Sequence, residues 1–261
     1  MRKFVLGIVG LVFLLLCAAV QSFAAGPSVF FNCAGAASCS TPATGDVMNE
    51  GFEGCSADGS SGCDKTWTTT GSGVTYNLAL PGTPPTGACS KGVEINGDGL
   101  DYITYDNGTG LTTYWAKFSF YVVSHSLANF AVTDLFAGGS AVTAVGAGLK
   151  LQLMNNNGII GVRANNNTNS TVVTNLNGVD GLGTWVTIEM CSTDGGLASD
   201  PCGAGTNGYG WIKVNGGAAV PLACVDTVDN IHRYFSAGVL QASKTARVVL
   251  GNIQIDDDGT Y

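Results

Sequence analysis

The stretch "KFSFYVV", residues 117–123, decides the fold class of this chain. Its apolar side chains Phe118, Phe120 and Val122 occupy every second position, so all three lie on one face of a β-strand. Residues 149–153 and 185–190 alternate in the same way. A strand with one apolar and one polar face is typical of an antiparallel sheet that packs against a core on one side.

Short apolar runs separated by Gly, Asn and Asp continue along the chain, and no stretch keeps a helical period. Asn-Gly turns within residues 154–158 and 214–217 predict two hairpins. Many short strands with turns between them indicate an all-β sandwich or barrel. We expect strands at residues 91–95, 101–105, 115–123, 131–136, 149–154, 159–164, 171–176, 185–191, 209–215, 234–241 and 246–256.

The N-terminal residues have the features of a secretory signal peptide. Arg2 and Lys3 precede an apolar run over residues 5–20, and the small residues Ser22 and Ala24 favour cleavage after Ala24. The run is short for a membrane-spanning helix, and we expect no membrane span after signal cleavage. We therefore expect a secreted or cell-surface protein from a bacterium. Its predicted parts are a signal peptide (1–24), an N-terminal arm or cap (25–49) and one β-sandwich (50–261).

The composition limits the possible partners. The length of 261 residues fits one large all-β domain after removal of a signal peptide. Only 11% of the residues are charged, and the net charge is −8. Because such a surface is a poor match for phosphate backbones, we exclude nucleic acid as a partner. The hydrophobic fraction of 45% is too high for a disordered chain.

The cysteines predict a disulfide-stabilised domain. Cys17 lies in the signal peptide, and an even number of cysteines in the rest of an exported chain indicates disulfides. A zinc site is disfavoured because no C-x-x-C occurs and His125 and His232 lie alone in the sequence. Spacing leaves the connectivity open. One pairing that closes short loops is Cys33–Cys39, Cys55–Cys63 and Cys191–Cys202, with Cys89 bonded to Cys224.

Several short motifs together resemble the concanavalin A-like lectin/glucanase superfamily in its LamG-type jelly-roll form, over about residues 51–258. The resemblance implies a two-sheet antiparallel β-sandwich whose first and last strands meet. It also implies that Phe52 lies in the core and that Glu53 lies where the two ends of the chain meet. We expect Trp67 to anchor the core or a loop and not to form a sugar-binding platform. The motifs are "GFEG" (51–54), "YWAKFSFYV" (114–122), "GTWVTIEM" (183–190), "GWIKVNGG" (210–217), "YFSAGVLQ" (234–241) and "ARVVLGNIQIDD" (246–257).

The resemblance makes glucanase one candidate function, but the residues of this chain disfavour it. Glucanases of this superfamily carry E-x-D-x-x-E or E-x-D-x-E on one strand, because two carboxylates about 5–5.5 Å apart must flank the scissile bond in a retaining enzyme. The four glutamates of this chain, Glu50, Glu53, Glu94 and Glu189, form no such motif. A glycoside hydrolase would therefore need a divergent set of carboxylates.

A polysaccharide lyase is a second enzymatic alternative. "YFSAGVLQ" is similar to the Y-F-K-A-G-x-Y-x-Q strand of alginate-lyase-like enzymes, but Ser236 and Leu240 stand in place of the lysine and the second tyrosine. A lyase needs an acid, a base and a group that neutralises the uronate. Tyr121, Arg163 and His125 would supply these groups if one sheet brought them together.

The C-terminal aspartates suggest a calcium site. The resemblance implies that the end of the last strand lies beside residue 53, where related sandwiches often hold structural Ca²⁺. Glu53, Asp256 and Asp257 would then supply carboxylate oxygens, which calcium prefers.

If their strands lie side by side in one sheet, the side chains that alternation directs away from the core form a candidate sugar-binding face, since sugars bind to polar groups and aromatic rings. These candidate ligand-binding residues are Tyr121, Lys150, Gln152, Arg163 and Glu189. The sequence thus favours a non-catalytic, lectin-like module whose partner is a polysaccharide or surface glycan. A divergent lyase or hydrolase remains an alternative. So does a structural subunit of an extracellular fibre or coat that self-associates through its N-terminal arm.

Overall fold

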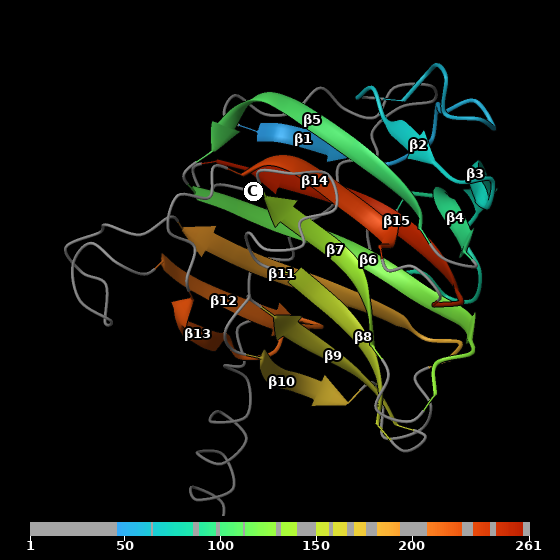
Figure 1. The fold of residues 1–261 in the computed structure, drawn as a ribbon. Helices are drawn as coiled ribbons and strands as arrows, with labels where there is room; N and C mark the ends of the chain where they lie inside the picture. The colour runs from blue at the N-terminus through green and yellow to red at the C-terminus, as the bar shows by residue number, and fades with distance from the viewer. Residues whose placement is uncertain are drawn as a thin grey trace, which may run out of the picture. The chain divides into compact units, whose positions relative to one another are not determined.

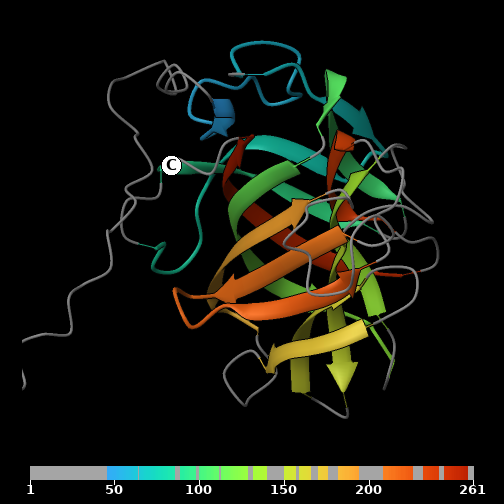
Figure 2. The same ribbon diagram turned by 90° about the vertical axis from the view of Figure 1, so that its left-hand side faces the viewer.

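Every regular element in the described part of the computed structural model is a β-strand (Figures 1 and 2). These residues offer no helix of the kind that crosses a membrane. The chain divides into the units Met1–Phe30 and Phe31–Tyr261, and all described residues belong to the second. The structure describes residues 46–63, 65–85, 89–97, 100–111, 113–128, 132–139, 150–156, 159–165, 170–175, 182–193, 208–225, 232–240 and 244–257.

The first sheet, sheet A, runs in the order β13-β12-β11-β6-β15-β4-β3, with β1 also paired to β15. All of its strand pairs are antiparallel. Its strands are β1 (Asp46–Glu50), β3 (Val74–Ala79), β4 (Lys91–Gly97), β6 (Thr113–His125), β11 (Trp185–Thr193), β12 (Gly208–Val214), β13 (Val220–Val225) and β15 (Ala246–Asp256).

The second sheet, sheet B, runs in the order β10-β9-β8-β7-β14-β5-β2 and is also antiparallel. In Figure 1 its strands lie in front of those of sheet A. They are β2 (Thr68–Thr70), β5 (Asp101–Leu111), β7 (Val132–Gly139), β8 (Lys150–Asn156), β9 (Ile159–Asn165), β10 (Ser170–Asn175) and β14 (His232–Val239).

The core lies between the two sheets, as the alternation predicts. Phe118, Phe120 and Val122 of β6 are fully buried. Phe118 of sheet A stacks on Phe136 of sheet B, with ring centroids 4.7 Å apart. Each strand expected from the apolar runs is present, and β13 is the second strand of the hairpin predicted within residues 214–217, whereas β1, β2 and β3 were not predicted. The predicted two-sheet antiparallel β-sandwich is therefore confirmed.

The first and last strands meet, as the resemblance implies. β1 pairs with β15, and Glu50 lies opposite Ile253. Phe52 follows β1 and is fully buried. β1 begins at Asp46, so the last residues of the predicted N-terminal arm belong to sheet A. Residues 1–45, which hold the predicted signal peptide and the rest of the arm, lie outside the described residues.

Both predicted hairpins are present. Residues 215–219 join β12 to β13, and the first two of them, Asn215 and Gly216, have φ values of 50° and 70°. Two consecutive residues with positive φ form the type I′ turn that an Asn-Gly pair favours. β8 pairs with β9 up to Asn156 and Ile159, and the two residues between them are not described.

Candidate functional site

The five predicted ligand-binding residues belong to two different sheets. Tyr121 and Glu189 lie on β6 and β11 of sheet A, whereas Lys150, Gln152 and Arg163 lie on β8 and β9 of sheet B. Because the apolar faces of the sheets meet in the core, their outer faces point in opposite directions. The condition that their strands lie side by side in one sheet is therefore not met, and ligand binding by each of the five residues stays a prediction. Alternation shows which side chains leave the core, but it does not show to which sheet they belong.

The outer face of sheet B is centred on a carboxylate that the sequence analysis missed. Gln152 Nε2 donates a hydrogen bond to Asp134 Oδ1 at 2.5 Å, and Lys150 Nζ lies 3.9 Å from Asp134 Oδ2. Asp134 and Gln152 are 6% and 3% exposed. We call these three residues the Asp134 cluster. The register places Arg163 opposite Gln152 on the next strand.

A β-bulge explains why Asp134 faces outward. The register between β7 and β8 shifts between Asp134 and Phe136, so that Asp134 pairs with Gln152 and Phe136 pairs with Leu151. A bulge changes the side on which the following residues project. A sequence signal existed, since Asp134 is a charged residue within an apolar run, but only the pairing shows its direction.

Hydroxyl groups continue the polar row across β14 and β5. Ala137 lies opposite Lys150 on one side and Ser236 on the other. The hydroxyls of Ser236 and Thr104 are 2.9 Å apart, and both residues are buried. The row therefore crosses four strands, from the Asp134 cluster to Thr104.

An exposed ion pair and an aromatic ring end this row. Tyr234 lies two residues before Ser236 on β14, on the same face, and opposite Asp106 of β5. Arg233 donates two hydrogen bonds of 2.7 Å to the Asp106 carboxylate, and its guanidinium lies 5.0 Å from the centre of the Tyr234 ring. The hydrogen bonds from Arg233 lower the pKa of Asp106.

The outer face of sheet A holds Glu189 between two lysines. Lys117 Nζ and Lys213 Nζ lie 3.7 Å and 3.3 Å from its carboxylate oxygens. Lys117 is 7% exposed, and burial lowers its pKa although Glu189 opposes this shift. The predicted residue Glu189 thus belongs to a cross-strand ion-pair ladder on β6, β11 and β12.

Tyr121 is packed against another part of the chain. Its ring centre lies 5.5 Å from that of Trp185, and Trp185 Nε1 donates a hydrogen bond of 2.7 Å to the carbonyl of Pro81. A Cβ on Gly82 would lie 3.2 Å from the Tyr121 ring. The segment after β3 therefore packs against this aromatic pair. Because His125 and Tyr121 are on β6 and Arg163 is on β9, the structure does not bring the three residues of the predicted lyase layout together.

The predicted calcium ligands have separate surroundings. The Glu53 carboxylate accepts hydrogen bonds from the backbone and hydroxyl of Ser90 and from the backbone N–H of Lys91. Asp256 is 1% exposed within β15, and Asp257 is exposed. Their ligand atoms do not form a three-residue group in the described part of the chain. Calcium binding by Glu53, Asp256 and Asp257 stays a prediction.

One group in the described ranges does bring three possible metal ligands together. Atoms of Glu50, Cys55 and Cys63 lie within 4.8 Å of one another. The two cysteines form a disulfide, which confirms the predicted Cys55–Cys63 pair.

The other predicted disulfides have different outcomes. Cys191 is a buried free thiol, and burial raises its pKa to about 12. The predicted Cys191–Cys202 pair is therefore wrong, because short spacing in the sequence does not show where a side chain points. Cys89 is disulfide-bonded, and its predicted pairing with Cys224 stays a prediction. Cys33, Cys39 and Cys202 lie outside the described residues, as does the side chain of Cys224.

Comparisons with known proteins support the fold. No protein-family model matches the chain. No curated protein matches it either. Among solved structures, a carbohydrate esterase from the Shiga toxin-encoding bacteriophage phi24B has a TM-score of 0.52 at 15% identity, with 82% of this chain and 99% of that chain covered. At this identity the likeness shows a shared β-sandwich fold alone.

Two further structures are more distant. An alginate lyase from Chlorella virus has a TM-score of 0.42 at 15% identity and covers 73% of this chain and 93% of its own. The binding domain of botulinum neurotoxin serotype D has a TM-score of 0.49 at 10% identity, and the match covers 83% of this chain but only 48% of the toxin domain. These scores carry no argument about function.

Proposed function

We propose that this protein is a secreted, non-catalytic carbohydrate-binding module of the concanavalin A-like type, and that it binds sugars on the outer face of sheet B. The observation that carries this proposal is the polar row from the Asp134 cluster to Tyr234. Each sugar hydroxyl both donates and accepts a hydrogen bond. Lys150 and Tyr234 are partly exposed, so Lys150 can donate hydrogen bonds to a sugar and the Tyr234 hydroxyl can donate and accept them, whereas Asp134, Gln152, Ser236 and Thr104 are nearly buried and are bonded across the strands. Tyr234 adds a ring against which apolar sugar faces pack.

The geometry favours binding over hydrolysis. Glycoside hydrolysis needs two carboxylates on either side of the scissile bond. Asp106, the other carboxylate described in this row, is held by Arg233 in a two-bond ion pair. The cross-strand contacts instead hold Asp134 and Gln152 in place before a ligand arrives, which reduces the entropic cost of binding.

Two further observations support the proposal. The Cys55–Cys63 disulfide is typical of proteins in oxidising compartments, which agrees with export. The phage protein that shares the fold is named as a carbohydrate esterase, and this makes carbohydrate the first class of ligand to test.

The test is a glycan array followed by calorimetric titration of the best ligand. We expect Asp134→Asn to weaken binding about tenfold or more, because losing a charge-assisted hydrogen bond costs about 1.5–3 kcal/mol. Glu94→Gln, which breaks the ion pair of Glu94 with Arg247 on sheet A, is the matched control and should bind as the wild type does. Thermal melting checks that both variants are folded.

Two results would contradict the proposal. A folded wild-type protein that binds no glycan would argue against carbohydrate recognition. A loss of binding in Glu189→Gln, with none in Asp134→Asn, would move the site to the outer face of sheet A.

A further inference from the structure

Glu50 is a fully buried carboxylate at the end of β1. Its Oε1 accepts a hydrogen bond of 2.8 Å from the backbone N–H of Phe52. Its Oε2 accepts bonds of 3.2 Å from the backbone N–H of Lys65 and from Trp67 Nε1. These donors lie on both sides of the Cys55–Cys63 loop in the sequence. The carboxylate therefore holds the two ends of the loop together through contacts that do not involve the sulfur atoms.

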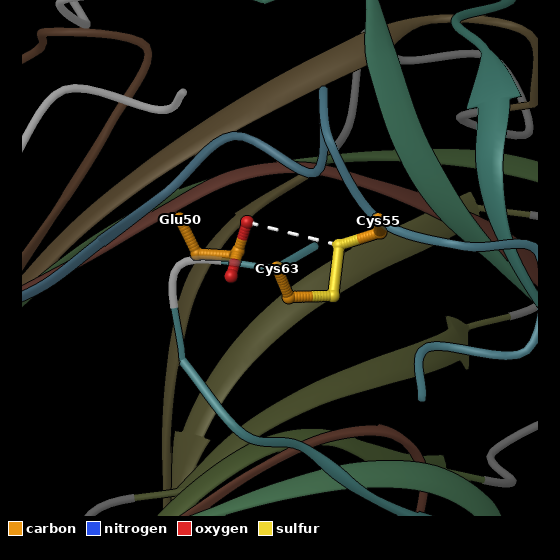
Figure 3. Close-up of side chains that lie close together, drawn as sticks. All are labelled: Glu50, Cys55 and Cys63. Carbon is orange, nitrogen blue, oxygen red and sulfur yellow. Dashed lines mark hydrogen bonds between the residues drawn. A yellow bond between two sulfur atoms is a disulfide. The ribbon is translucent and has the colours of Figure 1, made fainter. Parts of the chain in front are cut away.

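The two sulfur atoms lie against this carboxylate (Figure 3). Glu50 Oε1 is 4.0 Å from Cys55 Sγ, and the ligand atoms of all three residues lie within 4.8 Å of one another. A disulfide sulfur carries no proton, so this contact becomes a thiol hydrogen bond only after reduction. Cys55 is 1% exposed, whereas Cys63 is partly exposed. A reductant or a metal ion therefore has access from the side of Cys63.

The loop has its own hydrogen bonds, which do not depend on the disulfide. The backbone N–H of Ser56 donates to the carbonyl of Ser61 at 2.8 Å, and that of Tyr76 donates to the carbonyl of Ala57 at 3.1 Å. Asp58 Oδ1 accepts hydrogen bonds of 2.7 Å from the hydroxyls of Ser56 and Ser60. We expect these bonds to keep both cysteines near Glu50 when the S–S bond opens.

We propose that the reduced protein binds Zn²⁺ through Glu50, Cys55 and Cys63. A dithiol breaks the S–S bond and is itself oxidised to a disulfide, while both cysteines become thiols. When Zn²⁺ binds, the two thiols release their protons. Two thiolates and one carboxylate are ligands that zinc takes, and a water molecule would complete the tetrahedron. Thiolates select zinc over the hard cations calcium and magnesium. The loop thus has two alternative closures, a disulfide and a metal ion.

The test compares reduced and oxidised protein in a titration with Zn²⁺ alone, and then with Co²⁺, whose absorption spectrum reports thiolate ligands. The other cysteines are the same in wild type and in Cys55→Ser/Cys63→Ser, so the double variant measures their background. We expect reduced wild type to bind one equivalent more than the double variant, and we expect oxidised wild type to lack this equivalent. Glu50→Gln should weaken binding at this site at least tenfold. Cys191→Ser, which removes a thiol on β11 that is not part of this group, should leave binding at the site unchanged.

Three outcomes would overturn the proposal. The first is that the reduced wild type and Cys63→Ser, a single change in the partly exposed ligand, bind the same amount of Zn²⁺ with the same affinity. The second is that the oxidised and the reduced wild type bind Zn²⁺ equally. The third is that reduction alone abolishes the β-sheet circular-dichroism spectrum. If Glu50→Gln does not fold, the comparison with Cys63→Ser still decides.

Discussion

Acidification should destabilise this protein through one buried histidine. His232 is fully buried at the start of β14, and its ring lies edge-on to Tyr114, with centroids 4.6 Å apart. Burial lowers its pKa from 6.5 to about 4, although a hydrogen bond to the backbone of Gly138 opposes this shift. The imidazole is therefore neutral in the folded protein at pH values at which it is protonated in the unfolded chain.

The size and direction of the effect follow from linkage. Between about pH 6.5 and pH 4 the unfolded chain binds a proton that the folded protein does not, so stability falls as the pH falls. Above this window His232 has no effect on the pH dependence of stability. At about 1.4 kcal/mol for each pH unit, the difference between the two pKa values corresponds to about 3 kcal/mol at pH 4.

The assay is urea unfolding of wild type, His232→Phe and His125→Gln between pH 7.5 and pH 4. Phenylalanine keeps the aromatic contact with Tyr114 but cannot be protonated. Carboxylates titrate in the same range, so the quantity to compare is the difference between the stability curves of two proteins. We expect wild type and the His125→Gln control to lose about 3 kcal/mol more than His232→Phe across this window. Parallel curves for wild type and His232→Phe would refute the reasoning.

Three further predictions concern a buried hydroxyl, a strained residue and calcium. The Tyr114 hydroxyl is buried with no hydrogen-bond partner in the described part of the chain. Tyr114→Phe should therefore raise the free energy of unfolding by about 1 kcal/mol. A decrease of that size, measured by urea unfolding, would contradict this prediction. Leu100 is 40% exposed with a φ of 55°, a conformation that costs a residue with a Cβ about 1–2 kcal/mol. Leu182 is similarly exposed, so Leu182→Gly is the control. Leu100→Gly should be about 1 kcal/mol more stable than this control, and equal stabilities of the two variants would argue against strain at Leu100. If Glu53, Asp256 and Asp257 bind calcium, excess Ca²⁺ should raise the melting temperature relative to that measured with a chelator. The gain in folding stability should be about 2.7 kcal/mol at a Ca²⁺ concentration of 100 times Kd. Asp257→Asn should reduce this gain, and identical melting curves of the wild type with Ca²⁺ and with chelator would exclude the site.

Local side-chain patterns were sufficient to predict the strands and the core. Side chains alternate across a strand whatever its partner, so the directions of Phe118, Phe120 and Val122 could be read from the sequence alone. The Asn215-Gly216 turn was predictable for the same reason, because its φ values depend on the two residues themselves. β1 was missed because it is short and is stabilised by pairing with β15, and that pairing has no signal within its own residues. β13 was implied by the predicted hairpin that follows β12.

The candidate site was decided by tertiary structure. Lys150, Gln152 and Glu189 all carry polar side chains directed out of the core, yet strand pairing places the first two on one outer face and Glu189 on the other. Asp134 joins the first pair through a β-bulge, and Cys191 faces a buried environment without a disulfide partner. Alternation is a property of neighbouring residues. Sheet membership, register and cysteine partners depend on contacts between residues far apart in the chain, and these are set by the packing of the whole sandwich.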